Sequence, residues 1–176
     1  MPSLASSGDY ARDVKIEYTI EQRGDDVRIK KNSKTFRSIC YAVETTESAN
    51  KISPVDFAQA VLDTEFPALL TAIAKEESTF VLRAKHKRSG AWGLFQVRQC
   101  VWGELTTPDS AAEQAKQAER VLKYYLNESR GRIVPALEGW LGGARKGSTY
   151  VARVLKTYRS LKGVKDVHVN KATYAG

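Results

Sequence analysis

Apolar residues recur three and four positions apart over most of the chain from residue 52 onward. This spacing puts them on one face of a helix and predicts amphipathic helices. Small polar residues and prolines, which favour helix starts, precede these stretches. We predict helices that begin near Ser53, Thr64, Thr107, Ile133 and Ser148. The last three are expected to end near Ser129, Leu141 and Leu161, each shortly before a glycine. The expected fold class is mainly α.

The first fifty residues follow a different pattern. Residues 14–20 alternate apolar and polar, residues 23–26 read as a turn, and residues 27–30 as a short returning strand. They predict a small β-hairpin, with an irregular arm as the alternative. Residues 34–46 are ambiguous, although four apolar positions lie at helical spacing: Phe36, Ile39, Cys40 and Val43. Polar residues 44–51 read as a linker. We therefore divide the chain into an extension (1–51), a helical domain (52–163) and a tail (164–176).

Composition and charge narrow the class of protein. The chain has 176 residues, of which 42% are apolar, enough for one domain with a sizeable core. No apolar run approaches the roughly 18 residues of a membrane helix, so no membrane span is expected. A net charge of +8 favours polyanions such as nucleic acid, anionic lipid or acidic wall polymers. Because the basic residues are scattered and no aromatic stacking platform accompanies them, we do not expect nucleic acid as the main partner.

The chain has too few cysteines and histidines for most metal sites or for a Ser-His-Asp triad. Cys40 and Cys100 could form a disulfide or remain free thiols. His86 and His168 are the only histidines, and no zinc-like spacing occurs, so we expect no metal or other cofactor. The first eight residues lack the basic start and apolar core of a signal peptide. The chain is expected to act where it is made, to leave by another route, or to begin after a removed signal.

Two glutamates end the apolar helix predicted from Thr64. Glu77 lies four residues after Ile73 and three before Phe80, so it shares a face with the core, whereas Glu76 lies at the edge of that face. A carboxyl group beside buried apolar residues can have its pKa raised, which a general acid needs. The alternative is that both are solvated helix-end residues, and periodicity favours Glu77 only slightly.

The residues around this acid resemble a known family. Glu77-Ser78-Thr79-Phe80, followed by Gly90-Ala91-Trp92-Gly93-Leu94-Phe95-Gln96, is similar to the Glu-Ser-x-Phe … Gly-Ala-x-Gly-Leu-Met-Gln signature of soluble lytic transglycosylases. That family has a lysozyme-like, mostly helical fold and is related to goose-type lysozyme. Residues 136–143 stand where the family has Ala-x-x-x-Tyr-Asn-Ala-Gly, and residues 150–158 resemble its closing helix. The resemblance covers residues 52–161, for which it implies a lysozyme-like helical domain.

The resemblance implies a reaction and a set of site residues. A single carboxyl group, here Glu77, protonates the glycosidic oxygen between N-acetylmuramic acid and N-acetylglucosamine. It then acts as base on the muramic C6 hydroxyl and gives a 1,6-anhydro product. No second acid stands at a fixed spacing, as ordinary glycoside hydrolysis would require. The implied substrate-binding residues are Ser78, Gly93, Phe95, Gln96, Trp140 and Tyr158.

These residues have expected roles of different kinds. Gly93 would let the backbone turn close to the sugar, and Gln96 would hydrogen-bond an acetamido or hydroxyl group, with a surface amide as the alternative. Ser78 would steady the end of the helix. Phe95 could wall the groove or be a core aromatic. Tyr158 could point its hydroxyl at the cleft or simply pack in the core.

The sequence also departs from the family pattern. Trp140-Leu141 replaces Tyr-Asn, so the tyrosine hydroxyl that approaches the acid is absent, although Trp140 can still stack on a sugar. Val81-Leu82 replaces Asn-Pro. Basic residues 85–88 stand where the family has a serine, and they could meet phosphate or carboxylate groups of the wall or be a solvated loop.

The leading expectation is a lytic transglycosylase that acts on peptidoglycan glycan strands in the periplasm or cell wall. The alternatives are a lysozyme-type muramidase and a non-catalytic wall-binding or assembly module that keeps the fold. A basic helical nucleic-acid binder is a third alternative, but nothing in the order of residues favours it. Residues 1–50 could dock the chain to a secretion apparatus or a phage particle.

Overall fold

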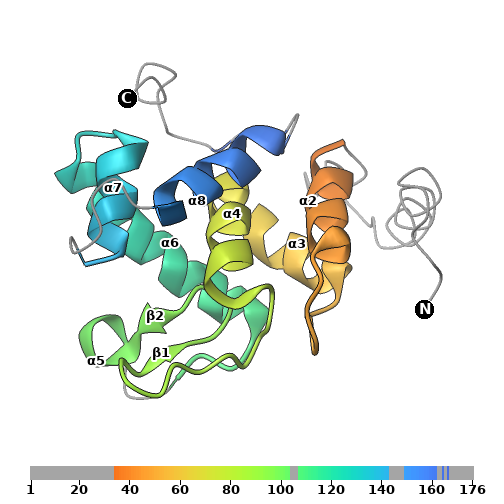
Figure 1. Ribbon diagram of the computed structural model, residues 1–176, viewed down its shortest axis with the longest axis horizontal. Helices are drawn as coiled ribbons and strands as arrows, with labels where there is room; N and C mark the ends of the chain where they lie inside the picture. Colours follow the sequence, from red (N-terminus) through yellow and green to blue (C-terminus); the bar gives the residue numbers. More distant parts are fainter. Residues whose placement is uncertain (1–33, 104–106, 143–148, 162–163, 165, 167–176) are drawn as a thin grey trace, which may run out of the picture.

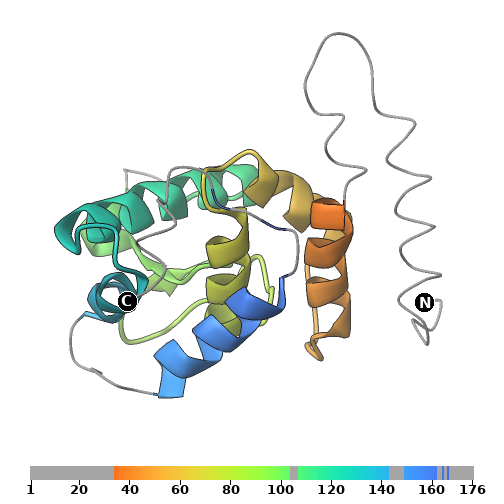
Figure 2. The same ribbon diagram turned by 90° about the horizontal axis from the view of Figure 1, so that it is seen from above.

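Figures 1 and 2 show two views of the computed structural model, which describes residues 34–103, 107–142, 149–161, 164 and 166. The hairpin predicted over residues 14–30 lies outside the described residues. The helices are α2 (Lys34–Thr45), α3 (Pro54–Leu62), α4 (Pro67–Ser78), α5 (Gln99–Trp102), α6 (Ala111–Glu128), α7 (Ile133–Trp140) and α8 (Thr149–Ser160). The strands are β1 (Ala91–Trp92) and β2 (Val97–Arg98). The chain is mainly helical, as predicted.

Helix α4 is the centre of the molecule. It lies between α6 and α8, as Figure 2 shows. Its residues from Pro67 to Ala74 are all buried, so it is apolar on every side rather than along one stripe. A helix of this kind belongs in a core because no face of it suits water. Its last turn, which carries Glu76 and Glu77, emerges from that core.

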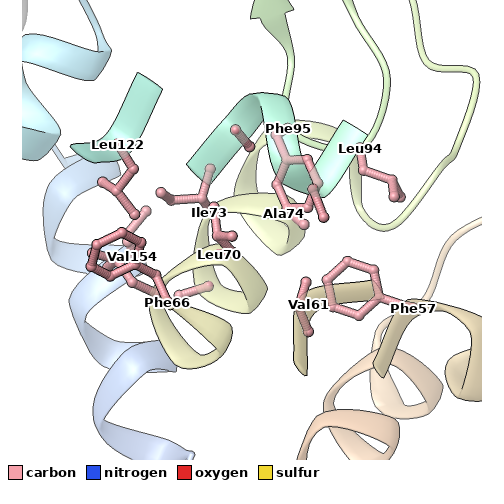
Figure 3. Packing of buried hydrophobic residues seen from close by; sticks show 14 of the residues in the cluster. Phe57, Val61, Phe66, Leu70, Ile73, Ala74, Leu94, Phe95, Leu122 and Val154 are labelled. Atoms are coloured by element: carbon pink, nitrogen blue, oxygen red, sulfur yellow. The ribbon is translucent and has the colours of Figure 1, made fainter. Parts of the chain in front are cut away.

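The core around α4 draws residues from several parts of the chain. Figure 3 shows Leu70 and Ile73 of α4 among side chains of α3, α6, α8 and the segment between β1 and β2: Phe57, Val61, Leu122, Val154, Leu94 and Phe95. The rings of Phe57 and Phe80 meet edge to face with centroids 4.9 Å apart. Burial of this apolar surface holds α4 in place, with each fully buried large side chain contributing about 1.5–3 kcal/mol.

The segment left ambiguous by its sequence is helix α2. The four apolar residues noted at helical spacing are all buried and join the same cluster: Phe36, Ile39, Cys40 and Val43. Lys51 Nζ closes the end of α2 by donating to the carbonyls of Val43, Glu44 and Thr46 at 2.7–3.1 Å. Residues 34–45 therefore share one core with the domain predicted to start at residue 52.

Helix α6 starts later than predicted, at Ala111 rather than near Thr107. Ser110 caps it by accepting a hydrogen bond from the backbone N–H of Glu113 at 3.2 Å. The Pro108 carbonyl is taken by side chains, since it accepts from Trp92 Nε1 at 3.0 Å and from Gln114 Nε2 at 3.2 Å. These tertiary hydrogen bonds keep residues 107–109 out of the helix. The start of α3, by contrast, is confirmed, with Ser53 as its N-cap.

The chain after α8 returns to the start of α4. Phe66 offers α4 no side-chain cap. Instead, the carboxylate of Asp166 accepts hydrogen bonds from the N–H groups of Ala68 at 2.7 Å and Leu69 at 3.2 Å. Burial raises the pKa of Asp166 to about 7, and the two backbone donors oppose that shift. The described part of the predicted tail is thus fastened to the domain.

Strands β1 and β2 form a small antiparallel sheet, with Ala91 opposite Arg98 and Trp92 opposite Val97. Gln114 of α6 holds the connecting loop in place. Its Oε1 accepts from the backbone N–H of Leu94 at 2.8 Å, and its Nε2 donates to the carbonyl of Leu82 at 3.0 Å. The hairpin is thereby tied to the helical core.

Candidate active site

Glu77 lies half-buried in the last turn of α4. The helix ends directly after it because Thr79 and Phe80 adopt positive φ angles of 50° and 64°. Non-glycine residues rarely occupy this region, and each costs of the order of 1 kcal/mol or more. The buried ring of Phe80 anchors the turn and offsets that cost. This strained turn ends α4 at the point where the Glu77 carboxylate leaves the core.

Tyr150, in the first turn of α8, faces Glu77. The side chain is buried, and its hydroxyl has no hydrogen-bond partner in good geometry among the described residues. Burial and the neighbouring charge of Glu77 raise the pKa of Tyr150 far above its ordinary value. The hydroxyl therefore stays protonated and lies close enough to Glu77 to be influenced by its charge.

Glu76 has a different environment from Glu77. Its carboxylate forms an ion pair with Arg153 of α8, with 2.8 Å between Oε2 and Nε. Arg153 also donates from Nη1 to the Thr149 hydroxyl at 3.3 Å. Helix α8 thus faces the end of α4 with a cation toward Glu76 and a phenol toward Glu77. Periodicity separated the two acids only slightly, whereas these partners separate them clearly.

Ser78 and Gly93 join the hairpin to the end of α4. The Ser78 hydroxyl is buried, donates to the carbonyl of Leu94 at 2.7 Å and accepts from the N–H of Val81 at 3.3 Å. Gly93 has a φ of +81°, and a Cβ at this position would collide with the side chain of Gln114. Both residues therefore shape the loop beside Glu77, and the part that they play is structural.

Gln96 and Phe95 also help to hold the loop together. Gln96 Nε2 donates to the carbonyls of Ala84 and Gly93, each at 3.0 Å, so the amide nitrogen braces the turn. Of the two roles predicted for Phe95, the structure gives core packing. The side chain is 1% exposed and its ring centroid lies 6.2 Å from that of Phe57. The prediction that Phe95 binds substrate directly is therefore wrong.

Trp140 and Tyr158 lie on two different helices, α7 and α8. Trp140 ends α7 and packs half-buried against the core. Tyr158 lies eight residues after Tyr150 on α8, about 12 Å further along the helix. Since α8 runs antiparallel to α4, with Arg153 at Glu76 and Asp166 at Ala68, this displacement leads away from Glu77. Tyr150 is the tyrosine of α8 whose pKa is raised by burial and, in addition, by the charge of Glu77.

Sequence reasoning missed the role of Tyr150. The sequence places it only within residues 150–158, which resemble a closing helix, and it is buried on α8 four residues before Val154. A tyrosine on a buried stripe signals a hydroxyl that needs a polar neighbour. Only the packing of α8 on α4 shows that the neighbour is Glu77. The hydroxyl that Trp140 cannot supply is present on a different helix.

Other features of the described residues do not suggest a second chemical centre. No group of three His, Cys, Asp or Glu side chains within the described ranges is placed to hold a metal ion. Cys40 is buried, Cys100 is exposed, and the two do not form a disulfide with each other. No helix in the same ranges is long and apolar enough to cross a membrane. A cavity of about 510 Å³ lies along the outer face of α6, away from Glu77, lined by residues that include Glu113, Lys116 and Arg120.

Comparisons with protein-family models, with curated proteins and with solved structures gave no significant match.

Proposed function

We propose that this protein is a peptidoglycan lytic transglycosylase with Glu77 as its general acid and base. The observation that carries the proposal is the pairing of Glu77 with the protonated hydroxyl of Tyr150 at the emerging end of a buried helix. The resemblance of residues 77–80 and 90–96 to the lytic transglycosylase signature gives this acid its substrate class. Residues 136–141, where the sequence departs from the signature, do not supply a tyrosine.

The reaction requires one carboxyl group in two states. In the first step Glu77 donates its proton to the glycosidic oxygen, and the bond from that oxygen to muramic C1 breaks. In the second step the Glu77 carboxylate takes the proton of the C6 hydroxyl as O6 bonds to C1. The anhydro ring closes, and Glu77 is protonated again, so no water is consumed.

Tyr150 supports the charged state of this cycle. Its hydroxyl remains protonated, because burial and the charge of Glu77 both disfavour its ionisation. As a donor it stabilises the Glu77 carboxylate that exists between the two steps, and it limits the directions in which that carboxylate can point. This is a positioning role, since the hydroxyl acts through Glu77.

The ion pair at Glu76 favours the single-carboxylate reaction over hydrolysis by two acids. A retaining or inverting hydrolase needs a second carboxylate across the scissile bond. Glu76, the nearest acid in sequence, is bound to Arg153 on the adjoining helix. The lysozyme-type alternative would therefore need its second acid from elsewhere.

The test compares Glu77→Gln with Glu76→Gln, two isosteric changes one residue apart. Each purified variant is incubated with peptidoglycan, and the released muropeptides are analysed by mass. We expect the wild type to release anhydromuropeptides and Glu77→Gln to release about 100-fold less or none. Glu76→Gln is expected to retain most of the activity.

Other outcomes identify the alternatives. Products with reducing ends would show a hydrolase. Binding to peptidoglycan without any release by the wild type would show a non-catalytic wall-binding module and would overturn the proposed reaction.

A further inference from the structure

The segment that leads into the hairpin carries a concentration of positive charge. Between residues 83 and 98 the chain has no aspartate or glutamate, and its basic residues are Arg83, Lys85, His86, Lys87, Arg88 and Arg98. All of these residues are exposed. We call Lys85–Arg88 the basic turn.

The basic turn has a defined shape. Lys85 forms a β-bridge with Trp92 of β1. The N–H of His86 donates to the Ala91 carbonyl, and the N–H of Gly90 donates to the His86 carbonyl, each at 3.0 Å. The Ser89 hydroxyl lies 2.9 Å from His86 Nδ1. These bonds hold Lys87 and Arg88 at the tip of a closed turn.

The charge of the turn is not neutralised within the described part of the chain. Arg83 forms an ion pair with Asp109 at 3.2 Å. Lys85, Lys87, Arg88 and Arg98 have no carboxylate partner among the described residues. Lys123 of α6 and Arg153 of α8, by contrast, form ion pairs with Glu65 and Glu76. These cations therefore lie on the hairpin and on the turn that leads into it: Lys85, Lys87, Arg88 and Arg98.

The basic turn adjoins the candidate active site. Ala84, the residue before it, accepts hydrogen bonds from the N–H of Gly93 at 2.7 Å and from Gln96 Nε2 at 3.0 Å. The same loop is bonded to the end of α4 through Ser78. Figure 1 shows the hairpin beside the lower end of α4, where Glu77 lies. A polymer that crosses Glu77 would have its side groups near these cations.

We propose that the basic turn binds the free carboxylates of the peptide stems that peptidoglycan carries on its muramic acid residues. This inference rests on the proposed function. The sugar backbone of the glycan is neutral, so cations beside the groove add nothing to sugar binding. The stems are its anionic groups, and unpaired cations attract them within a Debye length of about 8–10 Å. The protein thereby distinguishes peptidoglycan with free stem carboxylates from peptidoglycan in which these carboxylates are blocked.

Nucleic acid fits the turn less well. Single-stranded nucleic acid needs exposed aromatic faces for its bases beside the cations. Trp92 is the aromatic residue nearest to the turn in the sheet, and it is half-buried with its Nε1 bound to the Pro108 carbonyl. The charges stand on a short turn and do not follow a groove along several bases.

The experiment measures binding, with turnover removed by Glu77→Gln in every protein used. Peptidoglycan and the same material with its stem carboxylates amidated by a carbodiimide and ammonia are immobilised, and affinities are measured at about 20 mM and 500 mM salt. Lys87→Gln/Arg88→Gln is the test variant. Lys156→Gln/Arg159→Gln, which removes one exposed lysine and one exposed arginine from α8, is the matched control.

We expect the test variant to bind unmodified peptidoglycan about tenfold more weakly at low salt, with the difference lost at high salt. Affinity for the amidated material should be equal in all three proteins, and the control should match the parent. Equal losses in the two double variants would overturn the inference, as would equal affinity of the parent for both materials. Tighter binding to duplex or single-stranded DNA at the same salt would also overturn it.

The result can be separated from that of the cleavage assay. Absence of anhydromuropeptides with the wild type would end the proposed reaction, yet a stem-dependent affinity would still be measured with the Glu77→Gln protein. Conversely, cleavage that is indifferent to the basic turn, together with stem-independent binding, would end this inference alone.

Discussion

Replacing Tyr150 with phenylalanine should increase stability and decrease activity at the same time. The ring is 7% exposed, so its packing is kept in the variant. The hydroxyl that is removed is buried and has no hydrogen-bond partner in good geometry among the described residues. Such a group costs about 1–3 kcal/mol in the folded state. The nearby Glu77 carboxylate offsets part of this cost, so we expect the free energy of unfolding to rise by about 0.5–2 kcal/mol.

The activity should change in the opposite direction. Without the hydroxyl, the Glu77 carboxylate loses the donor that stabilises and orients it between the two proton transfers. A loss of about 10- to 100-fold in the rate of anhydromuropeptide release is expected, which corresponds to about 1.4–2.7 kcal/mol. Stability is measured by urea denaturation, and activity by mass analysis of muropeptides.

Tyr41→Phe provides the control, because Tyr41 is 44% exposed on α2, away from the site. We expect it to change stability by less than about 0.5 kcal/mol and to leave activity unchanged. Unchanged activity in Tyr150→Phe would refute the positioning role and reduce the residue to core packing. A loss of stability above about 1 kcal/mol would refute the view that its hydroxyl lacks a good partner.

Three further predictions test other parts of the structure. Because burial raises the pKa of Asp166 to about 7, the wild type should lose stability relative to Asp166→Asn as the pH rises from about 4 to 7, by up to about 4 kcal/mol. Stability is measured by urea denaturation, and a difference between the two proteins that stays constant over this pH range would contradict the prediction. Gly93→Ala should lower stability by about 2 kcal/mol or more, and clearly more than Gly90→Ala, since both have positive φ but only Gly93 lacks room for a Cβ. A thiol reagent should modify Cys100 at once and Cys40 only upon unfolding, whereas rapid reaction of both would place Cys40 at the surface.

Local periodicity predicted the helices from α3 onward except the short α5, because a helix repeats its contacts every three to four residues. The stripe of α2 is buried at the four positions that the pattern marked. The start of α3 followed from Ser53 and its proline. The start of α6 was misplaced because Pro108 is engaged by Trp92 and Gln114, and no local pattern reports such distant partners.

The site was predicted less completely than the fold. Ser78, Gly93 and Gln96 lie together in the loop beside Glu77, but their hydrogen bonds hold that loop in shape. Phe95 is in the core. A motif fixes which residues occur near one another in sequence, whereas their exposure depends on what the loop packs against.

The sequence by itself determined a mainly helical chain, a basic surface and an acid at the end of its most apolar helix. Spacing alone favoured Glu77 over Glu76 only slightly for the core side of that helix. Tertiary structure decided which partners the acids receive, since Tyr150 and Arg153 reach them only because α8 packs antiparallel on α4. It also decided that Asp166 caps α4 from almost a hundred residues away. Spacing along the chain specifies a face of a helix, but the group opposite that face is set by long-range packing, which a short sequence pattern does not encode.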